Sequence, residues 1–212
     1  MRNIRPSLGL RQILDVRQES DPRYAVDSQR LTAPTSLPIR VADARAQLRI
    51  DDERLDGMID LWLQGLTANL EQITQRALIT QRWQFFYSGF SNDMALPMTP
   101  VVSIESITYL DRQGHRQTLD PSQYELVQNS ARTYLTLSSQ SPLPQTREVD
   151  RAVDITCQCG YGDDPSDVPA SLRLYLMMRL VEQFDSASNG SAPAQTSFAD
   201  YLLEPYRVLQ AG

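Results

Sequence analysis

The hydrophobic positions of residues 40 to 76 recur at helical spacing. Residues 41–48 predict a short helix, and a longer helix follows Asp51-Asp52 and ends near residues 74–76. Asp51 or Asp52 is suited to cap this second helix, because a short carboxylate accepts hydrogen bonds from the free first-turn amides. Spacings of three and four define its predicted buried face. The face consists of Leu55, Met58, Ile59, Trp62, Leu66, Leu70 and Ile73.

Alternating patterns predict strands between residues 83 and 159. The predicted strands are 83–90, 102–110, 116–119, 124–127, 134–137 and 149–159. Turns near Gly114 and Asn129 indicate two β-hairpins. Along the last strand, Val149, Val153, Ile155, Cys157 and Cys159 share one face, and Arg151 intrudes on it near the strand's exposed start.

A last helix is predicted from Val168-Pro169 to about Asp185, since proline suits the first turn of a helix. The order of elements predicts an α+β fold with an N-terminal helical pair, antiparallel β-hairpins, and a C-terminal helix with an extended tail. We therefore expect a core over 37–186, and a linker with a C-terminal docking segment over 187–212. Residues 1–36 are expected to be an arm that orders on a partner surface, or else a leader without function.

Composition is that of an ordinary globular protein, with 41% hydrophobic and 22% charged residues among 212. The net charge of −6 does not favour binding to nucleic acid. All basic residues other than His115 are arginine, which indicates either fork-shaped contacts to anions or the codon bias of a GC-rich genome. No apolar run approaches the roughly 20 residues that span a bilayer, and the N-terminus does not resemble a signal peptide, so cytosolic synthesis is expected.

Candidate chemistry is sparse. His115 lies in a predicted turn, where a catalytic base finds neither a cleft nor an orienting partner. Cys157 and Cys159 suit small core positions better than half of a zinc site, which needs four ligands.

Acidic clusters offer a third candidate. Asp163, Asp164 and Asp167 follow two glycines, so they either hold a divalent cation or cap the next helix, with Asp167 or a neighbour as the cap. Asp51-Asp52-Glu53 invites the same interpretation. No GxSxG, Walker A or HExxH spacing is present, so we expect neither an enzyme nor a cofactor. A metal-dependent nucleic-acid hydrolase using the Asp163, Asp164 and Asp167 cluster and a DNA-binding module are the alternatives.

Five segments, in order along 37–209, resemble the head–tail connector (adaptor) proteins of tailed bacteriophages. Asp43-Ala44-Arg45 stands where that family usually has Glu-Ala-Lys, before Leu-Arg and an acidic pair. Residues 71–83 are similar to its "Glu…Thr-Gly-Arg-Ala-Leu…Gln…Trp" signature, with Gln75 in place of glycine. The other segments are the proline-led strand 100–109, the strand-to-helix turn 160–169 and the closing segment 202–207.

This resemblance implies a ring, expected to be dodecameric, beneath the portal protein of a capsid. It implies that DNA passes through the channel without specific binding, and that a tail-completion or tail-terminator protein docks on the far side. The protein would lie in the virion neck, without contact to a membrane, after assembly in the bacterial host cytoplasm. The residues expected to contact the portal or a neighbouring subunit are Tyr201, Leu202, Leu203, Tyr206 and Arg207; the alternative is that they pack back on their own core.

Overall fold

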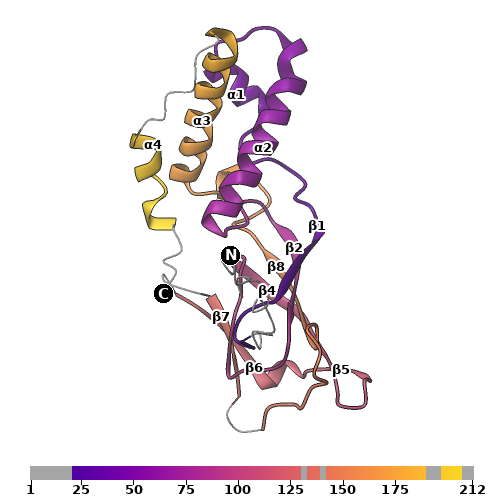
Figure 1. The fold of residues 1–212 in the computed structure, drawn as a ribbon. Coiled ribbons are helices and arrows are strands. Elements are labelled where there is room, and N and C mark those ends of the chain that lie inside the picture. The colour runs from indigo at the N-terminus through magenta and orange to yellow at the C-terminus, as the bar shows by residue number, and fades with distance from the viewer. Residues whose placement is uncertain (1–20, 130–132, 139–141, 190–196, 207–212) are drawn as a thin grey trace, which may run out of the picture.

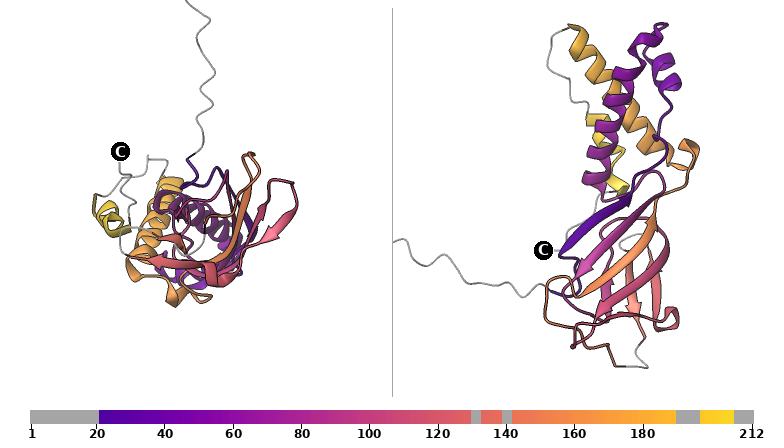
Figure 2. Two further views of the ribbon diagram at one scale, coloured as in Figure 1. Left: turned by 90° about the horizontal axis from the view of Figure 1, so that it is seen from below. Right: turned by 90° about the vertical axis from the view of Figure 1, so that its right-hand side faces the viewer.

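The computed structural model describes residues 21–129, 133–138, 142–189 and 197–206. Helices gather at one end of an elongated molecule and strands at the other (Figures 1 and 2). Each end has its own cluster of buried apolar side chains, one between the two sheets and one among the helices. The predicted α+β class is confirmed.

The helical end is built on the two long helices α2 and α3. The helices are α1 (Val41–Gln47), α2 (Asp56–Thr74), α3 (Ala170–Asn189) and α4 (Ser197–Tyr201), with 3₁₀ turns η1 (Glu53–Leu55), η2 (Pro121–Gln123), η3 (Pro165–Asp167) and η4 (Glu204–Tyr206). α2 packs against α1 and α3, and α4 packs against α3. Asp52 was one of two residues predicted to cap the long helix, but it caps η1 instead, by accepting a hydrogen bond from the amide of Arg54 at 3.0 Å. The N-cap of α2 is Leu55, without a side-chain hydrogen bond. η1 leads directly into α2.

The buried face of α2 differs from the predicted one. Ile59 and Leu70 are fully buried as predicted, but Met58 and Ile73 are exposed, with 36% and 46% of their surface accessible. The buried stripe runs instead through Leu63, which the hydrophobic pattern did not single out. Apolar residues occur around much of this helix, so spacing alone fits more than one face.

All strand pairs are antiparallel and form two sheets. The five-stranded sheet has the order β1 (Asp27–Thr32), β2 (Gln81–Tyr87), β8 (Val153–Cys159), β4 (Val101–Leu110) and β5 (Arg116–Thr118). The three-stranded sheet has the order β3 (Asp93–Ala95), β7 (Thr133–Leu137) and β6 (Tyr124–Gln128). Both predicted hairpins, β4–β5 and β6–β7, are present.

Strand β8 is the centre of the larger sheet, paired with β2 on one side and β4 on the other. Val153, Ile155, Cys157 and Cys159 point into the core, as the alternation predicts. The predicted strand start was wrong, because Val149 and Arg151 lie in the preceding turn. There the Arg151 guanidinium is ion-paired with Asp27 and lies 4.4 Å from the centre of the Phe86 ring.

Further elements depart from the prediction, among them the short strand β3 and the helix α4, neither of which was predicted. Residues 27–32 form the edge strand β1 on β2, although no strand was predicted there. All six of its residues are exposed, so it lacks the half-buried alternation by which strands are recognised. Helix α3 continues to Asn189, beyond the predicted end near Asp185. Residues 1–20 lie outside the described chain, so the role predicted for the arm stays a prediction.

Candidate docking site

The turn from α2 into β2 is organised by one buried carboxylate. Glu71, only 6% exposed, accepts hydrogen bonds at 2.8 Å from the amide of Leu78 and from the side-chain amide of Gln81. Burial raises the pKa of Glu71, and these two bonds oppose that effect. The Thr74 hydroxyl donates to the carbonyl of Leu70 at 2.7 Å. Glu71, Thr74 and Gln81, which belong to the connector-like signature, thus fix the path of the chain out of α2.

Gln75 ends α2 in the left-handed conformation, with φ 53° and ψ 40°. The amide of the next residue, Arg76, returns to the Glu71 carbonyl at 3.2 Å, which is the closure of a Schellman motif. Glycine is the usual residue at such a position because it has no Cβ to clash. The structure therefore explains why a glycine is commoner here in the proteins that the sequence resembles.

The Gly160-Tyr161-Gly162 turn packs directly on this exit segment. The Thr80 amide donates to the Gly162 carbonyl at 2.9 Å, and the Tyr161 amide donates to the Leu78 carbonyl at 3.3 Å. Gly160 has φ +139°, and a Cβ there would lie 2.6 Å from the Cα of Thr80. Two connector-like segments that are distant in sequence are therefore in contact at the junction of helices and sheet.

The C-terminal segment closes the same junction. The Tyr206 hydroxyl lies 2.9 Å from the Ser171 hydroxyl, and its ring lies 5.4 Å from the Arg76 guanidinium. Arg76 in turn donates to the Tyr161 hydroxyl at 3.4 Å. At the other end of the segment, the Asp200 carboxylate pairs with Arg179 of α3 at 3.0 Å.

The five predicted docking residues have different environments. Leu203 is 2% exposed and belongs to the helical core, and Leu202 and Tyr206 pack against that core while half-buried. Tyr201 is 71% exposed, and Phe198, which the sequence did not single out, is 57% exposed. Arg207 lies outside the described residues. The segment packs on its own chain. Contact with a partner stays a prediction, and the exposed Tyr201 is the residue best placed to make that contact.

The acidic cluster serves local structure. Asp164 accepts hydrogen bonds from the amide and hydroxyl of Ser166 at 2.8 and 2.7 Å, and it pairs with Arg40 at 2.9 Å. These contacts lower the pKa of Asp164, with the Ser166 amide first among them. Asp164, a neighbour of Asp167, caps η3 ahead of α3, and Asp167 completes this capping box by accepting a hydrogen bond from the Asp164 amide at 3.1 Å. Within the described chain, no three His, Cys, Asp or Glu side chains, Asp163 included, are grouped to hold a metal ion.

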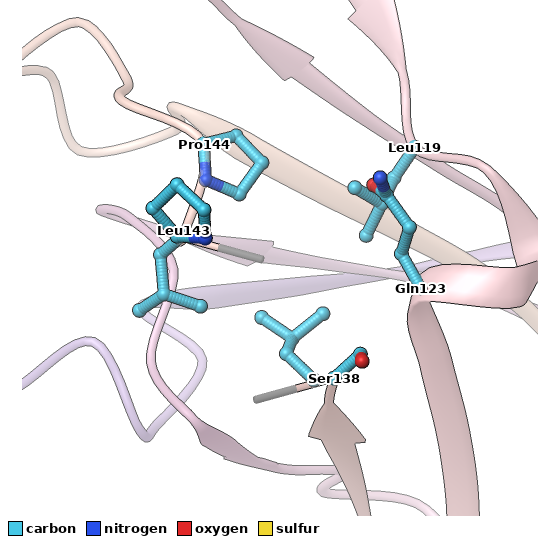
Figure 3. Close-up of a pocket in the computed structure, with 7 residues that line it drawn as sticks. Leu119, Gln123, Ser138, Leu143 and Pro144 are labelled. Atoms are coloured by element: carbon cyan, nitrogen blue, oxygen red, sulfur yellow. The ribbon is translucent and has the colours of Figure 1, made fainter. Parts of the chain in front are cut away.

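The remaining candidates are placed as predicted. His115 is exposed in the β4–β5 turn. Cys157 and Cys159 are buried with their sulfurs 3.5 Å apart, and their hydrogen bond together with burial raises the pKa of the Cys159 thiol. A pocket beside the end of β7, shown in Figure 3, has no titratable side chain in its lining. The lining residues are Leu119, Gln123, Leu137, Ser138, Pro142, Leu143 and Pro144.

Comparisons with known proteins show which solved structures share this fold. No protein-family model matches the chain, and neither does any curated protein. A chain from the neck of an empty gene transfer agent (GTA) particle, computed with C6 symmetry, matches with a TM-score of 0.74 and 21% identity. The match covers 88% of this chain and 97% of that one.

Two further solved structures agree. A chain from the neck of the native GTA particle, computed with C12 symmetry, has a TM-score of 0.69 and 22% identity over 88% of this chain and 97% of that one. A chain from the virion of the native GTA particle has a TM-score of 0.72 and 21% identity over 87% and 97%. In the described part of the chain, no helix is both long and apolar enough to cross a membrane. The chain thus has the fold of a GTA-particle neck protein, in agreement with the resemblance of its sequence to head–tail connector proteins.

Proposed function

We propose that this chain is a structural, non-catalytic subunit of the neck of a phage-like particle. As a head–tail connector it forms a ring beneath the portal, lets DNA pass, and offers a platform to a tail-completion or tail-terminator protein. The observation that carries the proposal is a fold shared with a neck chain over 97% of that chain's length. The C6 and C12 symmetries of those necks support a ring and suit a dodecamer.

The charge distribution fits a channel through which DNA slides. Tight phosphate binding depends on free cationic side chains, but many arginines of this chain are already paired with carboxylates. The paired arginines are Arg23, Arg40, Arg45, Arg54, Arg82, Arg116, Arg151 and Arg179. With a net charge of −6, the subunit is suited to line or surround DNA without holding it.

Electron microscopy tests the proposal directly. The purified chain is imaged alone and after mixing with portal-bearing capsids that lack it. We expect rings, or a new collar of density at the portal vertex. Intact capsids with an unchanged vertex, together with the absence of rings in the protein alone, would contradict a connector role.

A further inference from the structure

The side of α2 that faces away from its own core has no charged residue among its exposed positions, although Asp60, half-buried at the edge of this side, accepts a hydrogen bond from Gln64 at 2.6 Å. Its exposed positions are Gly57, Met58, Leu61, Gln64, Gly65, Ala68, Asn69, Gln72 and Ile73, here called the outer face of α2. By the helical period, Leu61, Gly65 and Ala68 lie opposite the buried Ile59 and Leu63. Leu61 has 65% of its surface accessible. A helix face in contact with water is normally rich in charged and polar residues, so this face has the composition of a contact surface.

Gly65 is a second, independent sign that something packs there. A Cβ added at Gly65 would meet nothing within 4 Å, so the packing of the chain on itself does not require glycine. Glycine in the interior of a helix is nevertheless unfavourable relative to alanine. A glycine that is costly and has no neighbour in its own chain leaves room for another molecule to approach the α2 backbone closely at this point.

The chain itself offers a matching surface on its opposite side. In Figures 1 and 2, α4 lies on one side of α3 and α2 on the other. Phe198 and Tyr201, three residues apart on one face of α4, are exposed. Asp200 is held by Arg179, so the exposed rings are not accompanied by a free carboxylate from the same helix. Phe198 and Tyr201 supply exposed aromatic rings, and the exposed positions of the outer face of α2 supply apolar and uncharged side chains with small residues at the centre, so the contact itself requires no charged group.

We infer that the outer face of α2 receives Phe198 and Tyr201 from a second copy of this chain. Because the two surfaces are different and lie on opposite sides of the helical end, the contact is head-to-tail, and its repetition builds a ring or a filament rather than a two-fold dimer. The ring is the form that the proposed function requires. This inference rests on the proposed function and names the subunit contact that such a ring uses.

Cysteine cross-linking tests the contact, because the native Cys157 and Cys159 are buried and give little background. The variant with Ala68→Cys and Tyr201→Cys is oxidised after assembly with portal-bearing capsids, and we expect a ladder of covalent oligomers on a denaturing gel. The matched control pairs Tyr201→Cys with Gln113→Cys, an exposed position in the distant β4–β5 turn, and is expected to give no ladder.

The outcomes separate the contact from the function. A collar by microscopy without a ladder from the first pair overturns the α2–α4 contact and leaves the connector role intact. Cross-links from Ala68→Cys to the portal protein assign the face to the portal and also overturn the contact. The absence of both collar and ladder removes the proposed function, and the inference with it.

Substitutions at Gly65 give a second readout that does not depend on cysteine chemistry. Gly65→Ala is expected to raise the Tm of the isolated subunit by about 2–4 °C, since it removes a helix-interior glycine that nothing in the chain contacts. Gly65→Arg is expected to leave that Tm near the wild-type value, yet to lower incorporation into the collar by tenfold or more (about 1.4 kcal/mol per tenfold). Normal incorporation of Gly65→Arg would refute the inference.

Discussion

The left-handed residue at the end of α2 allows a stability prediction of definite sign. Gln75 has φ 53°, a conformation that costs a residue with a Cβ roughly 1–2 kcal/mol. Glycine removes this cost. It also has more conformational freedom in the unfolded chain, which lowers the free energy of unfolding by about 0.4–1 kcal/mol. The backbone effect of replacing the Cβ-bearing residue by glycine is therefore a gain of about 0.5–1 kcal/mol.

The side chain of Gln75 must be separated from its backbone. It donates a hydrogen bond to the Gln72 carbonyl at 2.9 Å at an exposed site, and any truncation loses that bond. Gln75→Ala loses the bond and keeps the Cβ, so the comparison of Gln75→Gly with Gln75→Ala isolates the backbone effect. We expect the glycine variant to unfold about 1–4 °C higher than the alanine variant.

The assay is thermal and urea unfolding of the purified subunit, followed by circular dichroism. Gln72→Gly is the positional control, since Gln72 is exposed inside α2 and glycine there should destabilise by about 1 kcal/mol. The reasoning is refuted if Gln75→Gly is no more stable than Gln75→Ala, or if glycine has the same effect at both positions.

Two more predictions concern the same junction. Gly160→Ala should destabilise by about 2–5 kcal/mol in urea unfolding, because its Cβ would lie 2.6 Å from the Thr80 Cα at a positive φ; a loss below about 1 kcal/mol would contradict the tight contact. Burial raises the pKa of Glu71, so the folded state takes up this proton at a higher pH than the unfolded state does. Wild type should therefore gain stability relative to Glu71→Gln as the pH falls from about 7 to about 4, and a pH-independent difference between the two would count against that burial effect.

The segments that form the junction of helices and sheet could be predicted from the sequence, but their contact with one another could not. Residues 71–83, 160–169 and 202–207 were each recognisable as similar to connector segments, but their spacing in the chain does not show that they meet. The contact between Arg76 and Tyr206 exists because α2, the Gly160 turn and the C-terminal segment converge at one place. Such convergence is a property of tertiary packing, since the local pattern of each segment is satisfied without it.

The sequence also did not show which residues of the C-terminal segment are buried. Apolar residues at a chain end fit a docking segment as well as a packed one, and the spacing of Leu203 and Tyr201 does not distinguish them. The structure buries Leu203, in the turn after α4, among the helices and leaves Tyr201 at the end of α4 exposed. The outer face of α2 was missed for a related reason, as its Met58 and Ile73 were counted with the core.

The sequence by itself determined the elements whose signals are local. The period of α1 and α2, the alternation of β8, the turn that holds His115 and the placing of Cys157 and Cys159 all follow from neighbouring residues. Tertiary structure decided the rest, which includes the edge strand β1 and the side of α2 that is buried. Both features depend on contacts between segments that are distant in the sequence. The free energy of such contacts is not reflected in the residue pattern of either segment alone.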